Sequence, residues 1–378
     1  MSNHTTALVP IESWSYASPE LRMSGRSIDV GLFAESLIYY DRILVNPTNQ
    51  PQLASLIEWF QKEGAFEDFM AMVSEGTVKL YDYAFATTAI EKGGVYSIWN
   101  LQDSSQARTG TFEQRFLYHP SVEGVLPTKS RHRKRIYEAF RGNVIEAHAE
   151  EFSAPVENAR SDYKDPRRNS LVLQTFVDEI YRLKRLGRPP EVQVRVTSDE
   201  TGERHNIAWG IDLSELRKIS GTELNFNAGT PLTAGAHSNR LLWSAAQQNC
   251  DLYLPRPMGS LVGDKLYESV EEVAKAGRIV EELKDKVEFP DVRSLVNAGN
   301  LSFADVMAIR KKAKRFRSWL QAESERDRDA IIAYHHEVAK ESGYTRGGRK
   351  ALNLFGILGG GASGAYLGTV LGLSLIHI

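Results

Sequence analysis

The sequence predicts a mixed α+β fold that is rich in helix. Short β-forming runs alternate with helical patterns in the N-terminal part, which indicates a small sheet with helices between its strands. Amphipathic patterns dominate later, and the C-terminal part shows helical patterns alone. At the end, glycine recurs at every fourth position in a stretch without charge, so we expect the all-helical part to finish in an apolar glycine-zipper helix.

Composition indicates a globular protein of the cytoplasm. The 378 residues are 42% hydrophobic and 25% charged, enough for two or three domains with real cores. A net charge of −2 gives no overall attraction to nucleic acid or anionic lipid, so nucleic acid is disfavoured as a partner. The one cysteine, Cys250, excludes an internal disulfide framework, and the segment Met1 to Trp14 lacks the features of a secretory signal.

Changes in pattern divide the chain into five regions and a tail. In order, these are a mixed α/β domain at 1–130, a helix-rich region with short strands at 131–257, a helical connector at 258–300, an amphipathic helical hairpin at 301–345, a glycine-rich apolar segment at 346–372 and the tail at 373–378. The tail resembles the in-frame translation of a transposon mosaic-end adaptor used for sequencing libraries. We therefore expect the natural chain to continue beyond Gly372.

In the first region, helices and strands should alternate. Met1 to Arg26 is expected to be an irregular lead-in, because Pro10 and Pro19 interrupt any regular pattern. Helical spacing of apolar residues and β-rich runs between turn residues then predict helices at 31–39, 52–64 and 66–73, and strands at 38–45, 77–85, 94–99 and 111–118.

Helix should dominate the middle of the chain. Two long periodic patterns predict helices at Arg131 to Phe152 and Ser170 to Leu186, joined by a polar and basic linker at Ser161 to Arg168. After Pro189 and Pro190, the pattern predicts a strand pair at 192–196 and 205–209 around a turn at 199–202, a helix from Pro231 to Gln248 and a short strand at 251–254.

A helical hairpin should follow. Ser302 and Asp305 have the spacing of a capping box, which predicts a helix start. The apolar stripe of this helix is Val306, Ile309, Ala313, Phe316 and Leu320. A second stripe, Ile331, Tyr334 and Val338, continues to Gly343, so we expect the two helices to pack antiparallel.

The glycine ladder predicts close contact with another apolar surface. It consists of Gly356, Gly360, Gly364, Gly368 and Gly372. Each glycine in a helix costs about 0.8 to 1.0 kcal/mol relative to alanine, so a bare helix face is useful only where another backbone approaches. The uncharged stretch from Ala351 to Gly372 has 22 residues, against the roughly 20 that a bilayer span requires. We expect a membrane or a like helix, with possible self-association, as the partner.

Basic residues precede the ladder, as the positive-inside bias requires. Arg346, Arg349 and Lys350 would then lie at the cytoplasmic mouth of the segment and contact anionic headgroups. The expected location is therefore the cytoplasm, at the inner face of the membrane.

The same glycines allow a nucleotide-binding alternative. Residues Gly359 to Gly364 satisfy the pattern G-x-G-x-x-G, which looks like the start of a flavin- or nicotinamide-binding domain beginning at Leu354. In that case Gly359, Gly361 and Gly364 would bind FAD or NAD through its pyrophosphate. The ladder extends on both sides of the motif, however, which favours the zipper and no cofactor.

No metal or catalytic site stands out. His336 and Glu337 begin the pattern H-E-x-x-H, but Lys340 replaces the second histidine, and a protonated amine cannot bind zinc. Cys250 has no base near it in sequence, so a small buried residue is expected.

Two basic runs remain, at 131–135 and at 311–317. They are expected to be solvated helix faces, because neither contains the interleaved aromatic residues that stack on bases. The run at 131–135 leaves a nucleic-acid-associated protein as a second alternative to the membrane hypothesis.

The sequence thus favours binding or sensing over catalysis, with a membrane-associating C-terminal segment. A bacterial stress or defence effector is one protein of this kind. The ligand stays open, and the first alternative is an FAD- or NAD-dependent oxidoreductase.

Overall fold

The first strand of the chain lies inside a sheet, between a strand that follows it closely in the sequence and a strand from residues 251–252. The structure is a computed structural model and describes residues 6–11, 28–47, 50–83, 86–92, 95–101, 111–127, 129–147, 153–198, 200, 205–221, 229–254 and 292–314. Within these residues the protein is rich in helix and contains two sheets, one parallel and one antiparallel.

The parallel sheet has five strands in the order β6-β3-β2-β1-β9. Their bounds are β1 Thr6–Pro10, β2 Arg42–Asn46, β3 Val78–Tyr83, β6 Val144–Ala147 and β9 Asp251–Leu252. The register pairs Val9 with Val45 and Leu8 with both Leu44 and Leu252. The central strands are continuous apolar runs because both faces of a parallel sheet are covered. The sheet takes strands from both sides of the boundary expected at residue 130.

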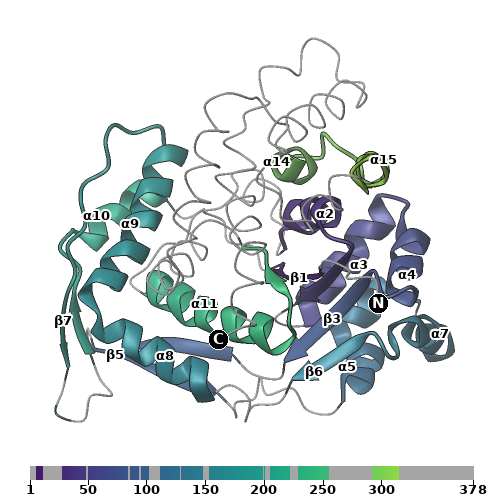
Figure 1. The fold of residues 1–378 in the computed structure, drawn as a ribbon, viewed down its shortest axis with the longest axis horizontal. Helices are drawn as coiled ribbons and strands as arrows, with labels where there is room; N and C mark the ends of the chain where they lie inside the picture. The colour runs from purple at the N-terminus through teal and green to yellow at the C-terminus, as the bar shows by residue number, and fades with distance from the viewer. Residues whose placement is uncertain are drawn as a thin grey trace, which may run out of the picture.

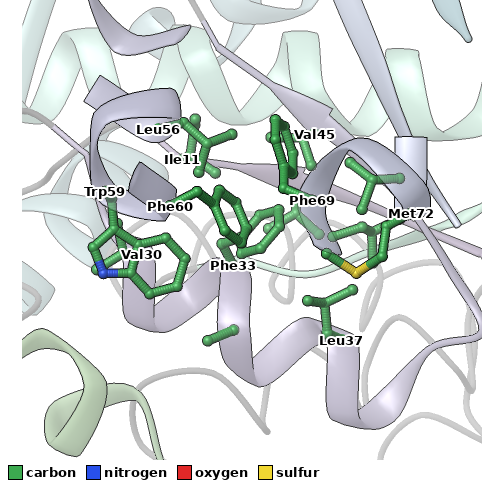
Figure 2. Close-up of a cluster of buried hydrophobic side chains, with 14 of the residues drawn as sticks. Ile11, Val30, Phe33, Leu37, Val45, Leu56, Trp59, Phe60, Phe69 and Met72 are labelled. Carbon is green, nitrogen blue, oxygen red and sulfur yellow. The ribbon is translucent and has the colours of Figure 1, made fainter. Parts of the chain in front are cut away.

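Helices from both ends of the chain cover the sheet and build the first core. These are α2 Val30–Tyr39, α3 Gln50–Lys62, α4 Phe66–Ser74, α5 Phe112–Tyr118, α6 Pro120–Val125, α7 Ser130–Phe140, α14 Val292–Asn297 and α15 Phe303–Lys312. Figure 2 shows Phe33, Phe60 and Phe69 in the middle of this core. The ring of Phe60 stacks on the ring of Phe69, with centroids 4.3 Å apart. The ring of Phe303 packs edge-on against the ring of Phe60, with centroids 4.9 Å apart.

The second core is built on the antiparallel sheet, whose order is β4-β5-β8-β7. Its strands are β4 Ala86–Lys92, β5 Val95–Leu101, β7 Arg195–Ser198 and β8 His205–Ala208, and its helices are α8 Ser153–Lys164, α9 Pro166–Leu183 and α10 Leu213–Ser220. Leu173, Phe176 and Ile180 of α9 are fully buried there, as the apolar period of that helix requires.

A long helix, α11 (Gly229–Gln247), connects the two cores. Its first half contributes Leu232, Ala234 and Ala236 to the second core. Its second half carries the buried Leu241 and Ala245, and the helix also contacts β1 and β9 of the parallel sheet. Figure 1 shows α11 running between the two parts of the molecule.

Most of the expected elements are confirmed. Helices α2, α3, α4, α9 and α11 and strands β2, β3, β5, β7, β8 and β9 lie within a few residues of their predicted positions. The capping box is also confirmed, because Ser302 accepts from the backbone N–H of Asp305 and the Asp305 carboxylate accepts from the N–H of Ser302. The all-helical C-terminal part that the sequence predicts extends well beyond residue 314. Residues after 314 lie outside the described part, so this prediction is not tested there.

Two expectations near the N-terminus and at 111–118 are wrong. The lead-in contains β1, because Pro10 ends an apolar strand rather than interrupting a loop. The run 111–118 is helix α5 and not a strand. Thr111 and Gln114 form a capping box there, and the buried Phe112 and Phe116 are one helical turn apart.

Two expectations in the middle are also wrong. The helix expected at 131–152 ends at Phe140, since Gly142 adopts a φ of 82° and the chain then forms β6 beside β3. The linker expected at 161–168 is helical on both sides of Asp165. That residue caps α9 through the backbone N–H groups of Arg167 and Arg168, and Pro166 occupies the first turn.

Candidate functional site at the carboxyl edge of the parallel sheet

The strand order singles out one edge of the parallel sheet. From β1 the chain builds outward through β2, β3 and β6, whereas β9 lies on the other side of β1. In open α/β sheets, ligands bind outside the carboxyl ends of the strands at such a reversal of order. The start of α2 and the residues directly after β1 and β9, Ile11 and Tyr253, therefore lie where such a sheet binds a ligand.

The start of α2 is held by a buried polar cluster. Asp29 caps the helix, since its Oδ1 accepts from the N–H of Leu32 at 2.8 Å, and its own N–H donates to the carbonyl of Ile11 after β1. Arg293 of α14 donates to Asp29 Oδ2 through Nε at 2.9 Å and Nη2 at 2.5 Å. Asn297 donates to Asp29 Oδ1 at 2.9 Å and accepts from the N–H of Gly31 at 2.8 Å.

This cluster occupies the place where an anion would bind. The free N–H groups at a helix start attract phosphate and carboxylate groups. In α2 these N–H groups are engaged by Asp29 and by Asn297, and the side chains of Asp29, Arg293 and Asn297 are almost completely buried. The N–H groups that would bind an anion are therefore occupied by side chains of the protein itself, Asp29 and Asn297 of α14.

The other end of α2 is also held from the C-terminal part. Arg310 of α15 donates to the carbonyl oxygens of Leu37, Tyr40 and Asp41, where α2 ends. A cation at the C-terminal end of a helix complements its macrodipole. Together, α14 and α15 hold α2 at both ends.

Across the reversal point, Glu35 of α2 bonds to Tyr253, which follows β9. The Tyr253 hydroxyl donates to Glu35 Oε2 at 2.5 Å, and both side chains are fully buried. Burial, followed by the Glu35 carboxylate, raises the pKa of Tyr253 well above its ordinary value of 10.0. The hydroxyl thus keeps its proton and remains a donor that fastens α2 to the end of β9.

Polar residues continue along the carboxyl ends of the remaining strands. Asn46, the last residue of β2, donates to the carbonyl of Tyr81 at 2.7 Å. Its Oδ1 and the Oε1 of Gln50 are buried and have no hydrogen-bond partner among the residues that the structure describes. A buried acceptor left unpaired costs about 1–3 kcal/mol, so these oxygens are ready to accept from a bound donor.

An ion cluster completes the edge at β3 and β6. The register pairs Asp82 with Glu146, and Arg115 of α5 bonds to Asp82 and lies 3.7 Å from Glu146 Oε2. Asp82 and Arg115 are buried, whereas the side chain of Glu146 is 44% exposed. The outer end of the edge can therefore meet a ligand through Glu146.

A second polar cluster lies on α11. Its members His237, Ser238, Asn239 and Arg240 are consecutive and buried. Asn239 donates to Asp162 Oδ2 at 2.6 Å, and Arg240 bonds to His237 Nδ1. Burial and the charge of Arg240 lower the pKa of His237 well below 6.5, so its ring is neutral and accepts the bond. The bond from Asn239 to Asp162 connects α11 to α8, whereas the bond between Arg240 and His237 lies within α11.

The site residues expected from the sequence lie mostly outside the described residues. This holds for the ladder Gly356, Gly360, Gly364, Gly368 and Gly372, for the nucleotide motif glycines Gly359 and Gly361, for the flanking Arg346, Arg349 and Lys350, and for His336, Glu337 and Lys340. They stay predictions.

Cys250 is described, and its surroundings agree with an unreactive thiol. Burial, followed by the charge of Asp251, raises the pKa of Cys250 from 9.0 to about 12. The thiolate that would act as nucleophile is therefore scarce at neutral pH.

Sequence reasoning missed the cluster at α2 because its members are far apart. Asp29 and Arg293 are separated by 264 positions, and nothing local connects them. One signal for this cluster was present in the sequence, an aspartate directly before an apolar helix. A different signal, four consecutive polar residues inside the helix predicted from Pro231, indicated the second cluster on α11.

In the described part of the chain, no group of three or more His, Cys, Asp or Glu side chains could hold a metal ion. None of the helices in that part has both the length and the apolar character needed to cross a bilayer.

Comparison with protein-family models, curated proteins and solved structures finds no match for this chain.

Proposed function

We propose that this chain is a binding and sensing protein. A small polar ligand binds at the carboxyl edge of the parallel sheet, and α14 and α15 couple its binding to a C-terminal segment that associates with a membrane or a like helix. The observation that carries the proposal is the hold of Arg293 and Asn297 on the start of α2, because it connects the ligand edge to the C-terminal part.

The chemistry of the edge favours a ligand with hydrogen-bond donors and an anionic group. Donors would satisfy the buried oxygens of Asn46 and Gln50. An anionic group would compete with Asp29 for Arg293 and with Asn297 for the N–H of Gly31. Such a ligand binds more tightly when α14 has moved, and this difference in affinity is what allows it to shift the equilibrium.

The output in this proposal is the glycine ladder, which supplies a bare helix face for a lipid or helix partner. The position of α15 supports the connection, because Arg310 bonds to the end of α2 and lies two residues before α15 ends at Lys312, on the side of the C-terminal segment. Association at the inner face of the membrane, with Arg346, Arg349 and Lys350 on the cytoplasmic side, follows from the charge of that region.

Membrane fractionation tests the proposal. We expect the full-length protein to sediment with membranes and Gly364→Asp to remain in the supernatant, because an ionised side chain costs roughly 2.5–3.5 kcal/mol at the centre of a membrane helix. Gly187→Asp is the matched control, since Gly187 is exposed and its added Cβ meets no atom within 4 Å. Wild-type protein in the supernatant, or equal behaviour of the two aspartate variants, contradicts the proposed output.

A second variant tests the coupling. Arg310→Ala frees the end of α2 from α15, so it should increase the membrane-bound fraction without ligand. If Arg310→Ala leaves the membrane-bound fraction unchanged while Gly364→Asp still stays in the supernatant, the C-terminal segment binds membranes but α15 does not control it, and the sensing mechanism is contradicted.

A further inference from the structure

The middle of α11 carries a set of buried hydrogen-bond donors that lies apart from the candidate ligand site. We propose that Arg240, Trp243 and Ser244 bind the phosphate group of a small molecule there. Trp243 and Ser244 are three and four positions after Arg240 in the helix, so the Cβ atoms of these side chains are neighbours at roughly 5–6 Å. One side of α11 thus combines a guanidinium group, an indole N–H and a hydroxyl group.

Two of these donors are unused. The Oγ of Ser244 and the Nε1 of Trp243 are buried, and neither atom has a hydrogen-bond partner among the residues that the structure describes. A serine inside a helix can donate to the carbonyl four residues earlier, as Ser238 does to Ala234 at 2.7 Å. The fully buried Ser244 makes no such bond. Buried polar groups are almost always paired in native proteins, so a ligand with acceptor oxygens is expected here.

Arg240 makes an anion the preferred acceptor. Its side chain is 2% exposed, and its guanidinium group bonds to Nδ1 of His237, one turn earlier in α11. Burial and the charge of Arg240 lower the pKa of His237 well below 6.5, so the imidazole is neutral. This bond therefore positions the guanidinium group without bringing a negative charge to it.

The number of donor groups favours a phosphate over a carboxylate. A carboxylate has two oxygens, and one guanidinium group can bond to both of them. A phosphate group offers three acceptor oxygens and carries a charge of about −1.5 to −2 at neutral pH. It can therefore bond to Arg240, Trp243 and Ser244 together.

The position of these residues suits a small ligand. They lie in the part of α11 between the two cores, and ligand sites are common at such junctions. Trp243 is half-buried, and Ala246 and Gln247, three and four positions after it, are exposed. Solvent therefore reaches the site from the side of Trp243. Arg240 and Ser244 lie too deep to touch the flat surface of a lipid bilayer.

Calorimetric titration of the full-length protein with inorganic phosphate tests the proposal. Ser244→Ala and Trp243→Phe each remove one donor and keep most of the side-chain volume. Each should weaken phosphate binding by about tenfold or more, because a hydrogen bond to a charged group is lost. Acetate should bind the wild-type protein at least about tenfold more weakly than phosphate.

A spectroscopic measurement locates the phosphate. The chain has six tryptophans, and the indole N–H signal of Trp243 in an ¹H–¹⁵N NMR spectrum is the one that Trp243→Phe lacks. This signal should shift when phosphate is added, because the N–H gains an acceptor. The signal of Trp59, in the first core, should stay in place.

Ser238→Ala is the matched control on the same helix. Its hydroxyl already donates to Ala234, so the variant should keep wild-type affinity for phosphate and lose stability. Ser244→Ala should instead keep its melting temperature without phosphate, since the hydroxyl that it loses is unpaired in the described structure.

Four outcomes overturn the proposal. The first is absence of phosphate binding at about 10 mM, a concentration at which even weak ligands bind. The second is binding that Ser244→Ala and Trp243→Phe leave unchanged, which would place the anion elsewhere, for example at the start of α2. The others are equal affinity for acetate, and binding to phosphatidic acid vesicles without binding to inorganic phosphate.

Discussion

The pair Asp29 and Arg293 illustrates what a buried charge requires. Removing two charges from water costs several kcal/mol, and their attraction offsets this only with good geometry and additional hydrogen bonds. Here the carboxylate accepts two bonds from the guanidinium and further bonds from Asn297 and the N–H of Leu32. Every contact of the carboxylate therefore depends on α14 or on the start of α2.

Arg293→Ala leaves that carboxylate buried without its cation. We expect the free energy of unfolding to fall by about 3–5 kcal/mol, measured by urea denaturation. Arg141→Ala is the control, because Arg141 and Glu138 form an exposed pair at 3.4 Å. A loss for Arg293→Ala no larger than for the control would show that the buried pair does not stabilise the fold.

Asp251 should make stability depend on pH. Burial raises its pKa from 3.8 to about 7. Between these values the folded protein keeps a proton that the unfolded chain has lost, so the stability that this group contributes falls as pH rises and is gone above about pH 7. Asp251→Asn removes this dependence because asparagine stays neutral.

Relative to wild type, Asp251→Asn should gain about 3 kcal/mol in the free energy of unfolding between about pH 4.5 and about pH 8. Urea denaturation at several pH values measures the difference. A difference that does not change with pH would mean that the aspartate is ionised throughout.

At the scale of elements, α2 is the helix on which the other parts converge. All ten of its residues are buried, as expected of a helix that is apolar around its circumference. Gly31 lets α14 approach, since a Cβ there would lie 2.2 Å from the backbone carbonyl oxygen of Arg293. The contact is between backbones, so no side-chain movement relieves it.

Gly31→Ala should therefore destabilise the protein by about 1–3 kcal/mol, because α14 must shift to make room. Gly124→Ala in α6 is the matched control, since its added methyl group meets no atom within 4 Å and alanine favours helix. The melting temperatures of both variants, measured by thermal unfolding, test this prediction. Equal melting temperatures would contradict the close approach of the two helices.

Local patterns predicted the elements whose signals are local. The helix that begins after Ser302 was found from a cap and a stripe, and α4 was found from apolar spacing closed by Gly76, whose φ is 72°. Element α5 was mistaken for a strand because aromatic residues favour strands, whereas the spacing of Phe112 and Phe116 favours a helix. Strand β1 was missed because five residues carry too little period to detect.

At the scale of the molecule, α11 should make the two cores unfold together. The helix belongs to the second core through Leu232 and contacts β1 and β9 of the parallel sheet. We expect native-state hydrogen exchange to give the same opening free energy for the slowest amides of β2 and α9. Two clearly different values would show that each core opens independently.

The overall architecture was only partly accessible from the sequence. A helix-rich mixed fold with a small sheet follows from periodicity and is confirmed. The pairing of β9 with β1, and the meeting of Asp29 with Arg293, depend on contacts between residues more than 200 positions apart. No local pattern encodes such contacts, so the candidate site could not be predicted together with the fold.

The distance in sequence between α2 and the helices α14 and α15 also affects how the chain folds during synthesis. Ribosomes add about 5–20 residues per second, so the interval between the synthesis of β1 and that of α15 is on the order of 15 to 60 s. Throughout this interval α2 is without the helices that later cover it. A nascent chain of this protein therefore presents an apolar helix that chaperones can bind, and its yield in a cell should depend on their supply.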